Sequence, residues 1–402
     1  MNITIISNIL PYPLSSGGAQ AQYNMIDILR KEHNISFIFT HEMRNSLKSM
    51  RHLQEIWPEV RFVPFLYVRQ MLYPPFLKAK AQRAFGIIFR RHSTRFFAER
   101  MLQPYGVCFS RDFIGFVNHH LIKTKCDIVQ VEFFPSLHIV NYLPQSVKKV
   151  YVQHEIRFVR NDRLFKDITL TASEAKLKDR VRQQEIDDMN KYDAVITLTN
   201  IDRNTLEDNG VTSRIQVSPA AVNSRQLPYK EWNGKLLFIG GYGHMPNKEG
   251  VDWFISSVAP LLSAKDRLGL DIFGTHWDTS YQNNKAIDIT LRGFVPDIAM
   301  ASGYILIVPL LTGSGMRMKI LEGAAMCLPI ITTTVGVEGL NFKHKESCLI
   351  ADTPQEFAEA IHLLRTNEDL RKELAFNAQE VFKSQYSRQA LAKVRDAIYK
   401  QL

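Results

Sequence analysis

A glycine-bearing loop followed by two cations and a carboxylate lies in the carboxyl-terminal half of the sequence. The loop residues are Gly313, Ser314 and Gly315, and the charged residues after them are Arg317, Lys319 and Glu322. Backbone N–H groups at a helix start, with the positive end of the helix dipole, favour a bound phosphate. Arg317 and Lys319 would add positive charge, and Glu322, one turn beyond Lys319, would be within reach of sugar hydroxyls. This spacing indicates a phosphate site next to a sugar site.

The elements that would position this loop can be read from the hydrophobic pattern. Residues 304–309 form an apolar run typical of a strand, whereas Met318, Leu321 and Ala325 recur at helical spacing. We therefore expect a strand, a glycine loop and a helix, with Ser314 as a candidate helix cap. A ligand-free alternative stays open, because glycines commonly precede amphipathic helices and Lys–Glu pairs are commonly solvated.

Length and composition bound the class of protein. A chain of 402 residues favours two domains of roughly 150–200 residues each. No segment approaches the roughly 20 apolar residues that cross a bilayer, and the amino terminus lacks the features of a signal peptide. We therefore expect a cytoplasmic protein; whether it is also peripheral at the inner face of the membrane depends on the basic segment described next. Four cysteines without Cys-x-x-Cys spacing indicate reduced packing residues; they are Cys108, Cys126, Cys327 and Cys348.

Positive charge is concentrated in residues 69–111. This segment holds nine Lys or Arg residues and one acid, Glu99, within a chain of net charge +10. Aromatic and aliphatic residues are interleaved with the cations at near-helical spacing, as in helices that lie on anionic membranes. Contact with an anionic membrane or acceptor competes with a second interpretation, a helical insertion with solvated cations. A nucleic-acid partner is not expected, because the rest of the chain shows no matching basic face.

Strand-like and helix-like patterns alternate along both halves of the chain. Strands are predicted at 2–7, 34–40, 60–65, 127–132, 148–153, 193–198, 214–219, 235–240, 268–274, 287–292, 304–309, 329–334 and 348–351. Helices are predicted at 19–32, 175–191, 200–209 and 249–262, among others. This alternation indicates two α/β domains, over 1–219 and 235–385, with a linker over 220–234 and a final helix over 386–402 that packs back on the first domain. His154 follows a strand, at the end where α/β sheets bind ligands, although a structural histidine is the commoner case.

Several motifs resemble those of the retaining glycosyltransferases of the large family 4 type. The matching stretches are Pro13-Leu-Ser-Ser-Gly-Gly-Ala, Phe238-Ile-Gly-Gly, His244-Met-Pro-Asn-Lys, Gly293-Phe-Val-Pro-Asp, residues 309–322, Gly336-Val-Glu-Gly-Leu and Ala351-Asp. The resemblance implies the GT-B fold, two Rossmann-like α/β/α domains that face each other across a cleft. It implies transfer of a sugar, with retention, from a UDP- or GDP-sugar to a saccharide or lipid-linked acceptor in polysaccharide or cell-envelope glycan synthesis. An enzyme of the hexosyltransferase class, EC 2.4, is therefore expected.

The resemblance also assigns roles to residues of this sequence. The expected catalytic residues are His154, near the transferred sugar, and Arg317 and Lys319, on the leaving phosphate. The expected donor-binding residues are Gly17, Gly18, Gly241, Lys248, Gly293, Phe294, Gly313, Ser314, Gly315, Glu322 and Glu338. Cations and loop N–H groups would stabilise the charge that develops on the diphosphate, so no metal and no further cofactor is expected.

One departure from the family pattern concerns the donor sugar. Many members carry two glutamates with seven residues between them, and here the first of these positions is Ser314, whereas Glu322 occupies the second. The sugar contact must then come from Ser314, from loop N–H groups or from elsewhere. Two alternatives stay open for the whole chain: a non-catalytic scaffold with this fold, and a relative that isomerises a sugar nucleotide.

Overall fold

The chain divides into two compact units in the computed structural model. The structure describes residues 1–14, 17–41, 44–66, 102, 109–166, 168–222, 226–262, 268–295, 298–313 and 316–402. The first unit comprises Met1–Ala220 and Ala392–Leu402, and the second comprises Ala221–Leu391. Most of the basic segment 69–111 lies outside the described residues, as do Cys108, Ser314 and Gly315. The other three cysteines are buried and unpaired, as packing residues would be.

The first unit is built on a parallel sheet of seven strands in the order β3-β2-β1-β4-β5-β6-β7. The strands are β1 Asn2–Ser7, β2 Asn34–His41, β3 Arg61–Leu66, β4 Ile128–Glu132, β5 Lys148–Gln153, β6 Ala194–Thr197 and β7 Arg214–Val217. They are short runs rich in β-branched, aliphatic and aromatic residues, and those of β1, β4 and β6 are almost wholly buried. β1 lies between β2 and β4, so the chain reverses its direction of strand addition there. Ligands of open α/β sheets bind at such a switch point.

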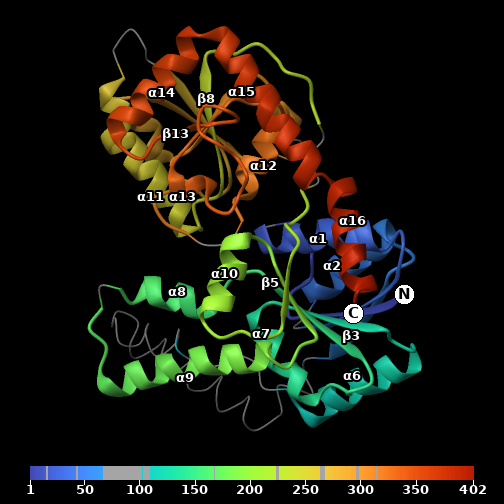
Figure 1. The fold of residues 1–402 in the computed structure, drawn as a ribbon. Helices are drawn as coiled ribbons and strands as arrows, with labels where there is room; N and C mark the ends of the chain where they lie inside the picture. The colour runs from blue at the N-terminus through green and yellow to red at the C-terminus, as the bar shows by residue number, and fades with distance from the viewer. Residues whose placement is uncertain are drawn as a thin grey trace. The chain divides into compact units, whose positions relative to one another are not determined.

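Helices cover both faces of this sheet. They are α1 Gly17–Leu29, α2 Arg44–Ile56, α6 Arg111–Lys123, α7 Phe134–Leu137, α8 Arg157–Leu164, α9 Ala172–Met189, α10 Asn200–Asp208 and α16 Arg388–Lys400. The apolar sides of α6 and α9 pack on Val129 and Val131 of β4, and both helices lie below the sheet in Figure 1. Because side chains alternate along a strand, Gln130 and Glu132 of β4 face the other way. A row of polar side chains therefore lies on the face opposite α6 and α9.

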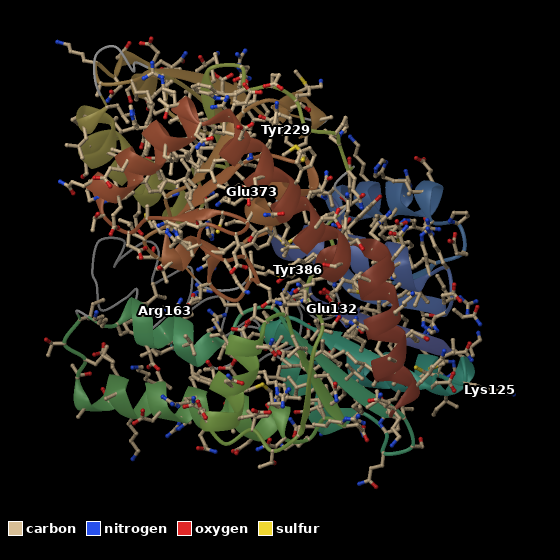
Figure 2. The ribbon with its side chains drawn as sticks, turned by 45° about the horizontal axis from the view of Figure 1, so that its top comes forward. Lys125, Glu132, Arg163, Tyr229, Glu373 and Tyr386 are labelled. Atoms are coloured by element: carbon tan, nitrogen blue, oxygen red, sulfur yellow. The ribbon has the colours of Figure 1, made fainter. Side chains whose placement is uncertain are left out.

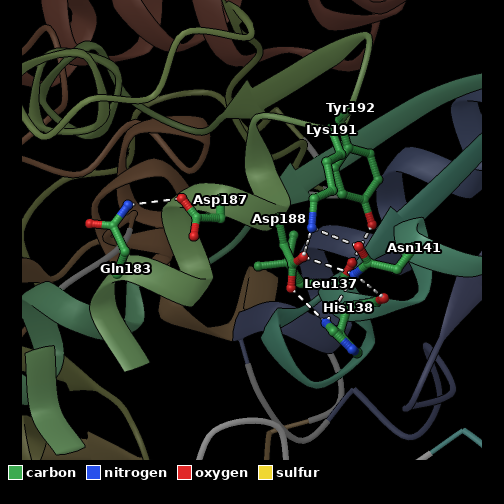
Figure 3. A network of polar contacts seen from close by, with 8 residues as sticks. All are labelled: Leu137, His138, Asn141, Gln183, Asp187, Asp188, Lys191 and Tyr192. Atoms are coloured by element: carbon green, nitrogen blue, oxygen red, sulfur yellow. Dashed lines mark hydrogen bonds and ion pairs between the residues drawn. The ribbon is translucent and has the colours of Figure 1, made fainter. Parts of the chain in front are cut away.

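A polar network joins α9 to the segment after α7 (Figure 3). The buried carboxylate of Asp188 contacts His138 Nδ1 at 2.7 Å and accepts from Asn141 Nδ2 at 2.8 Å. Lys191 Nζ donates to the same carboxylate at 2.9 Å, and the Tyr192 hydroxyl donates to Leu137 O at 2.6 Å. Buried polar groups require such partners, and this set holds the end of α9 against α7 and the segment after it.

The final helix α16 contributes two side chains to the first unit. Arg395 is buried and donates to Ser218 Oγ at 3.2 Å and to Gln130 Oε1 at 3.5 Å. The Tyr399 hydroxyl donates to the same oxygen of Gln130. The end of the chain is thus tied to the middle of the central strand β4.

The second unit contains a parallel sheet of six strands in the order β10-β9-β8-β11-β12-β13. The strands are β8 Lys235–Ile239, β9 Gly269–Phe273, β10 Asp288–Gly293, β11 Ile305–Val308, β12 Ile330–Thr332 and β13 Leu349–Ile350. β8 and β11 are neighbours, although the two strands that follow β8 in sequence extend the sheet in the other direction. The switch point of this sheet therefore lies at the carboxyl ends of β8 and β11.

Helices of the second unit are arranged in the same two-sided way. They are α11 Met245–Trp253, α12 Met318–Ala325, α13 Thr334–Val337, α14 Pro354–Thr366 and α15 Glu368–Val381. Leu306 and Val308 of β11 pack with α12 and α15, whereas Ile305 and Ile307 pack with α11 and α14. Figure 1 shows this unit with its strands enclosed by the labelled helices. Both units are thus doubly wound α/β layers, as the sequence predicts.

Two local expectations are wrong. The helix after the glycine loop begins at Met318 with Arg317 as its N-cap, so Ser314 lies too far upstream to cap it. The Arg317 side chain is buried and donates to Val335 O, which holds its backbone outside the helical region at ψ 79°. The single helix predicted over 249–262 starts earlier, as α11, and continues through a π-helical turn, Phe254–Val258, into a 3₁₀ turn, Ala259–Leu261. Within the described part of the chain, no helix has the length and apolar composition that a membrane span requires.

Candidate functional site

Lys319 of α12 contacts the first turn of α11. Its ammonium donates to Asn247 Oδ1 at 2.7 Å and lies 5.2 Å from the centre of the Phe238 ring. Asn247 is buried, and its amide donates to Gly241 O at 2.9 Å. The loop after β8 and the helix after β11 are thereby joined at the switch point of the second sheet. Lys319 and Gly241, both predicted site residues, lie in one polar cluster.

The charges of Lys319 and Glu322 are perturbed by burial. Burial, followed by the nearby Arg317 guanidinium, lowers the pKa of Lys319 to about 7, against the opposite effect of Glu322. Burial raises the pKa of Glu322 to about 7, and Lys319 acts in the opposite direction. Both groups therefore change charge near neutral pH, which is common at sites that bind or transform charged ligands.

Arg317 lies at the junction of α12 and α13. Its Nε donates to Val335 O at 3.2 Å, and its Nη2 lies 3.6 Å from Glu338 Oε2. Gly313, with φ 129°, adopts a backbone conformation that favours glycine, and a Cβ there would lie 3.5 Å from the same guanidinium. Arg317, Glu338 and Gly313 thus form one group, with Arg317 held from two sides.

Lys248 has a carboxylate partner within its own helix. Its Nζ lies 2.5 Å from Asp252 Oδ2, and the Tyr281 hydroxyl donates to Asp252 Oδ1 at 2.6 Å. The hydrogen bond and charge of Asp252 raise the pKa of Lys248, which keeps the ammonium charged. The side chain of Lys248 is 36% exposed, so it stays accessible to an anion.

Two predicted nucleobase-side residues lie at the end of β10. Gly293 has φ 66°, and its carbonyl accepts from Gly274 N at 2.8 Å. Phe294 follows with 69% of its surface exposed. An exposed aromatic ring next to a glycine turn offers a flat apolar surface for a ring-shaped ligand.

His154 of the first unit lies between an aromatic ring and an acid. Its Nε2 is 3.0 Å from Glu132 Oε2, at the carboxyl end of β4, and its ring stacks on Phe133 with centroids 4.1 Å apart at 13°. Glu132, marked in Figure 2, also accepts from Gln22 and Gln130. His154 Nδ1 is buried and has no hydrogen-bond partner among the described residues.

The glycine pair after β1 lies against the same aromatic ring. Gly17 and Gly18 begin α1, and a Cβ on Gly18 would come within 2.9 Å of the Phe133 ring. Phe133 itself has φ 65°, which is uncommon for a bulky residue. The missing side chain of Gly18 therefore makes room for Phe133, and through it for His154.

Sequence reasoning missed four residues that hold the predicted ones in place. They are Asn247 beside Lys319, Asp252 beside Lys248, and Glu132 and Phe133 beside His154. Asn247 lies in the motif His244-Met-Pro-Asn-Lys, and Glu132 is the last residue of the strand predicted over 127–132. The positions of both in the sequence could therefore have marked them as site residues. Among the described residues, no group of three or more His, Cys, Asp or Glu side chains could hold a metal ion.

Comparisons with known proteins agree with this architecture. The family model for glycosyl transferases group 1 matches residues 233–367, which lie within the second unit and include Lys248, Lys319 and Glu322. A Klebsiella pneumoniae protein, described as an uncharacterized 44.6 kDa protein in cps region, is 21% identical over 417 residues. That alignment covers 99% of each chain.

Solved structures show the same fold over the full length. The Anabaena protein Alr3699/HepE, solved with UDP and with UDP-glucose, superposes with a TM-score of 0.66 at 12% identity, with 100% of each chain covered. The pneumococcal O-GlcNAc transferase GtfA, solved with UDP and GlcNAc, superposes with a TM-score of 0.67 at 13% identity and covers 100% of this chain and 99% of its own. The chain therefore has the two-domain α/β GT-B fold.

Proposed function

We propose that the protein is a glycosyltransferase that moves a sugar, with retention, from a nucleotide diphosphate sugar to a saccharide or lipid-linked acceptor. The observation that carries this proposal is the cluster of Lys319, Asn247, Arg317 and Glu322 at the switch point of the second sheet. The cluster lies in the segment matched by the group 1 model. UDP and UDP-glucose bound to the Anabaena structure favour a UDP-sugar as donor. The cps region of the Klebsiella relative is consistent with a polysaccharide product.

The chemistry assigns a task to each charged group. When the bond between the anomeric carbon and the diphosphate oxygen breaks, negative charge develops on the leaving diphosphate. Arg317, Lys319 and Lys248 would stabilise that charge, and Glu322 would accept hydrogen bonds from the ribose hydroxyls. His154 would contact the transferred sugar. The working mechanism is a front-face displacement within an ion pair.

Two variants test the assignment of the donor site. Lys319→Ala and Glu322→Ala should each abolish transfer in a donor screen read by nucleotide release, while thermal unfolding stays close to that of the parent. Lys343→Ala, which removes an exposed lysine paired with Glu346 in the same unit, is the control and should retain activity. Transfer at parental rates by both site variants would refute the assignment.

Two other functions make different predictions. A non-catalytic scaffold would bind neither UDP nor GDP at millimolar concentration in calorimetry. A sugar-nucleotide isomerase would convert the donor alone into an isomer, whereas a glycosyltransferase without acceptor would only hydrolyse it slowly.

For the basic segment 69–111 we propose contact with an anionic membrane surface or acceptor. The support is its charge, because each Lys or Arg near an acidic bilayer contributes on the order of 1 kcal/mol. The fraction of the protein that sediments with anionic vesicles should fall at high salt. Equal binding to neutral vesicles would contradict an electrostatic contact.

A further inference from the structure

The hydrogen bonds around His154 show which of its ring nitrogens is the donor. Glu132 carries acceptor oxygens, and its three neighbours approach it with nitrogen atoms: Gln22 Nε2 at 3.0 Å, Gln130 Nε2 at 2.6 Å and His154 Nε2 at 3.0 Å. Because a carboxylate only accepts, the imidazole must donate from Nε2. In the neutral ring the proton then resides on Nε2, and Nδ1 carries a lone pair.

The ring has little freedom to turn away from this arrangement. Glu132 is 2% exposed and His154 9% exposed, and the Phe133 ring lies flat against the imidazole. Phe133 is itself confined, since Gly18 lies against its far edge with space for a hydrogen atom only. The acid sets the protonated nitrogen, and the aromatic ring sets the plane of the imidazole.

The other nitrogen is left for a ligand. His154 Nδ1 is buried and without a partner among the described residues. A buried acceptor without a hydrogen bond is destabilising, so a bound hydroxyl at this point would recover that loss.

We propose that Glu132 and Phe133 are positioning residues that hold His154 as an Nε2–H tautomer, so that Nδ1 accepts a hydrogen bond from a substrate hydroxyl. The hydroxyl part of this proposal depends on the proposed glycosyl transfer, whereas the tautomer does not. The site therefore recognises a sugar or acceptor hydroxyl as a donor and does not present a second N–H to the substrate.

The first unit contains its own control pair. His138 Nδ1 lies 2.7 Å from Asp188 Oδ2 and 3.0 Å from Asn141 Nδ2, so in that pair the carboxylate faces the opposite ring nitrogen (Figure 3). Two histidines of one domain should thus show opposite tautomers, each set by a buried acid. Neutralising one acid should affect one histidine only.

Nitrogen-15 spectra of the full chain labelled at histidine decide the tautomer without any substrate. At a pH where the rings are neutral, His154 should show a protonated Nε2 and a bare Nδ1, and His138 the reverse; His154→Gln and His138→Gln assign the signals. In Glu132→Leu the protected Nε2–H signal of His154 should be lost while His138 is unchanged, and Asp188→Asn should do the opposite. A protonated Nδ1 on His154, or no response to Glu132→Leu, would overturn the proposal.

Turnover then tests the use of this tautomer. With a donor identified by nucleotide release, Glu132→Gln should lower kcat by roughly 10- to 100-fold, the range known for partners that orient metal-bound histidines. Glu132→Asp should restore part of the loss, and the affinity for UDP should stay within about 2-fold of the parent, since the second unit would hold the nucleotide. Unchanged kcat in a Glu132→Gln variant with an altered tautomer would reject the functional role. If no donor is turned over and no nucleotide binds, the proposed glycosyl transfer fails while the tautomer result still stands.

Discussion

The ammonium of Lys319 donates to the side-chain oxygen of Asn247 at 2.7 Å, which joins the start of α12 to the start of α11. The two residues are 72 positions apart in the chain and meet where β8 and β11 end side by side. The same amide is anchored to Gly241 O, so the lysine is held by a part of the scaffold that is itself fixed. An ammonium that is oriented before the ligand arrives loses less freedom on binding.

Asn247→Ala should weaken nucleotide binding. Lys319 would lose the hydrogen-bond partner that orients its ammonium. Because hydrogen bonds to charged groups contribute roughly 1.5–3 kcal/mol, we expect the Kd for UDP or GDP to rise about 10-fold or more. Calorimetry measures this directly. The control is Asn233→Ala, which alters an asparagine at the opposite end of β8 that accepts from Lys235 N. Equal affinities for the parent and Asn247→Ala would show that the contact does not prepare the site.

Nucleotide affinity should depend on pH around neutrality. Burial lowers the pKa of Lys319 to about 7, so in the free protein its ammonium is present below pH 7 and lost as the pH rises above it. Because the diphosphate binds the charged form, affinity should fall between pH 6 and pH 8.5, and binding at pH 7.5 should take up a proton. Calorimetry in buffers of different ionisation enthalpy counts that proton.

Two variants show whether the proton is taken up by Lys319 or by the phosphate of the nucleotide. Lys319→Ala should remove the proton uptake that is specific to the protein. Glu322→Gln removes a carboxylate that raises the pKa of Lys319, so the loss of affinity should shift to lower pH. Proton uptake of the same size in Lys319→Ala would assign the effect to the ligand.

Lys248 and Lys235 form a matched pair for testing the phosphate contact. Both are part-exposed lysines paired with an aspartate, Lys248 with Asp252 at 2.5 Å and Lys235 with Asp271 at 3.0 Å. Only Lys248 lies after the carboxyl end of β8, whereas Lys235 begins that strand. Lys248→Ala should raise the Kd for nucleotide roughly 10-fold, and Lys235→Ala should leave it unchanged. A loss of affinity in both variants, or in neither, would remove Lys248 from the proposed site.

Sequence patterns predicted the strands well because strands of parallel sheets are short buried runs. Asn2–Ser7 and Lys148–Gln153 were predicted with the bounds that the structure shows, and the alternation with helices led to the doubly wound class. Helix starts were less predictable. Serine is a common N-cap residue, which led to the expectation for Ser314. The helix α12 begins instead at Met318, after Arg317, whose buried side chain donates to Val335 O. Tertiary contact overrode local preference there.

Partners far apart in the chain could not be predicted from periodicity. A hydrophobic pattern tells which side of a strand faces the core, so Gln130 and Glu132 could be assigned to one face. It does not tell that Arg395, 265 residues later, lies against Gln130, or that His154 lies against Glu132. Charges and glycines therefore located the candidate site, and the side chains that orient it required the fold.

The close packing of α11 against Pro309, the residue that follows β11, yields a last prediction, because α11 carries Asn247 and Lys248. A Cβ on Gly250 would lie 2.5 Å from Pro309 O and 3.1 Å from its carbonyl carbon, so backbone must move to admit it. Alanine favours a helix over glycine by about 1 kcal/mol, but overpacking against backbone costs roughly 1–3 kcal/mol, so Gly250→Ala should lower the free energy of unfolding. It should also weaken nucleotide binding, since the start of α11 would shift.

Gly115→Ala in α6, where a Cβ would meet nothing within 4 Å among the described residues, should instead be neutral or stabilising. Denaturant unfolding of both variants compares the two, and a Gly250→Ala protein as stable as Gly115→Ala would show that α11 has room to move away from β11.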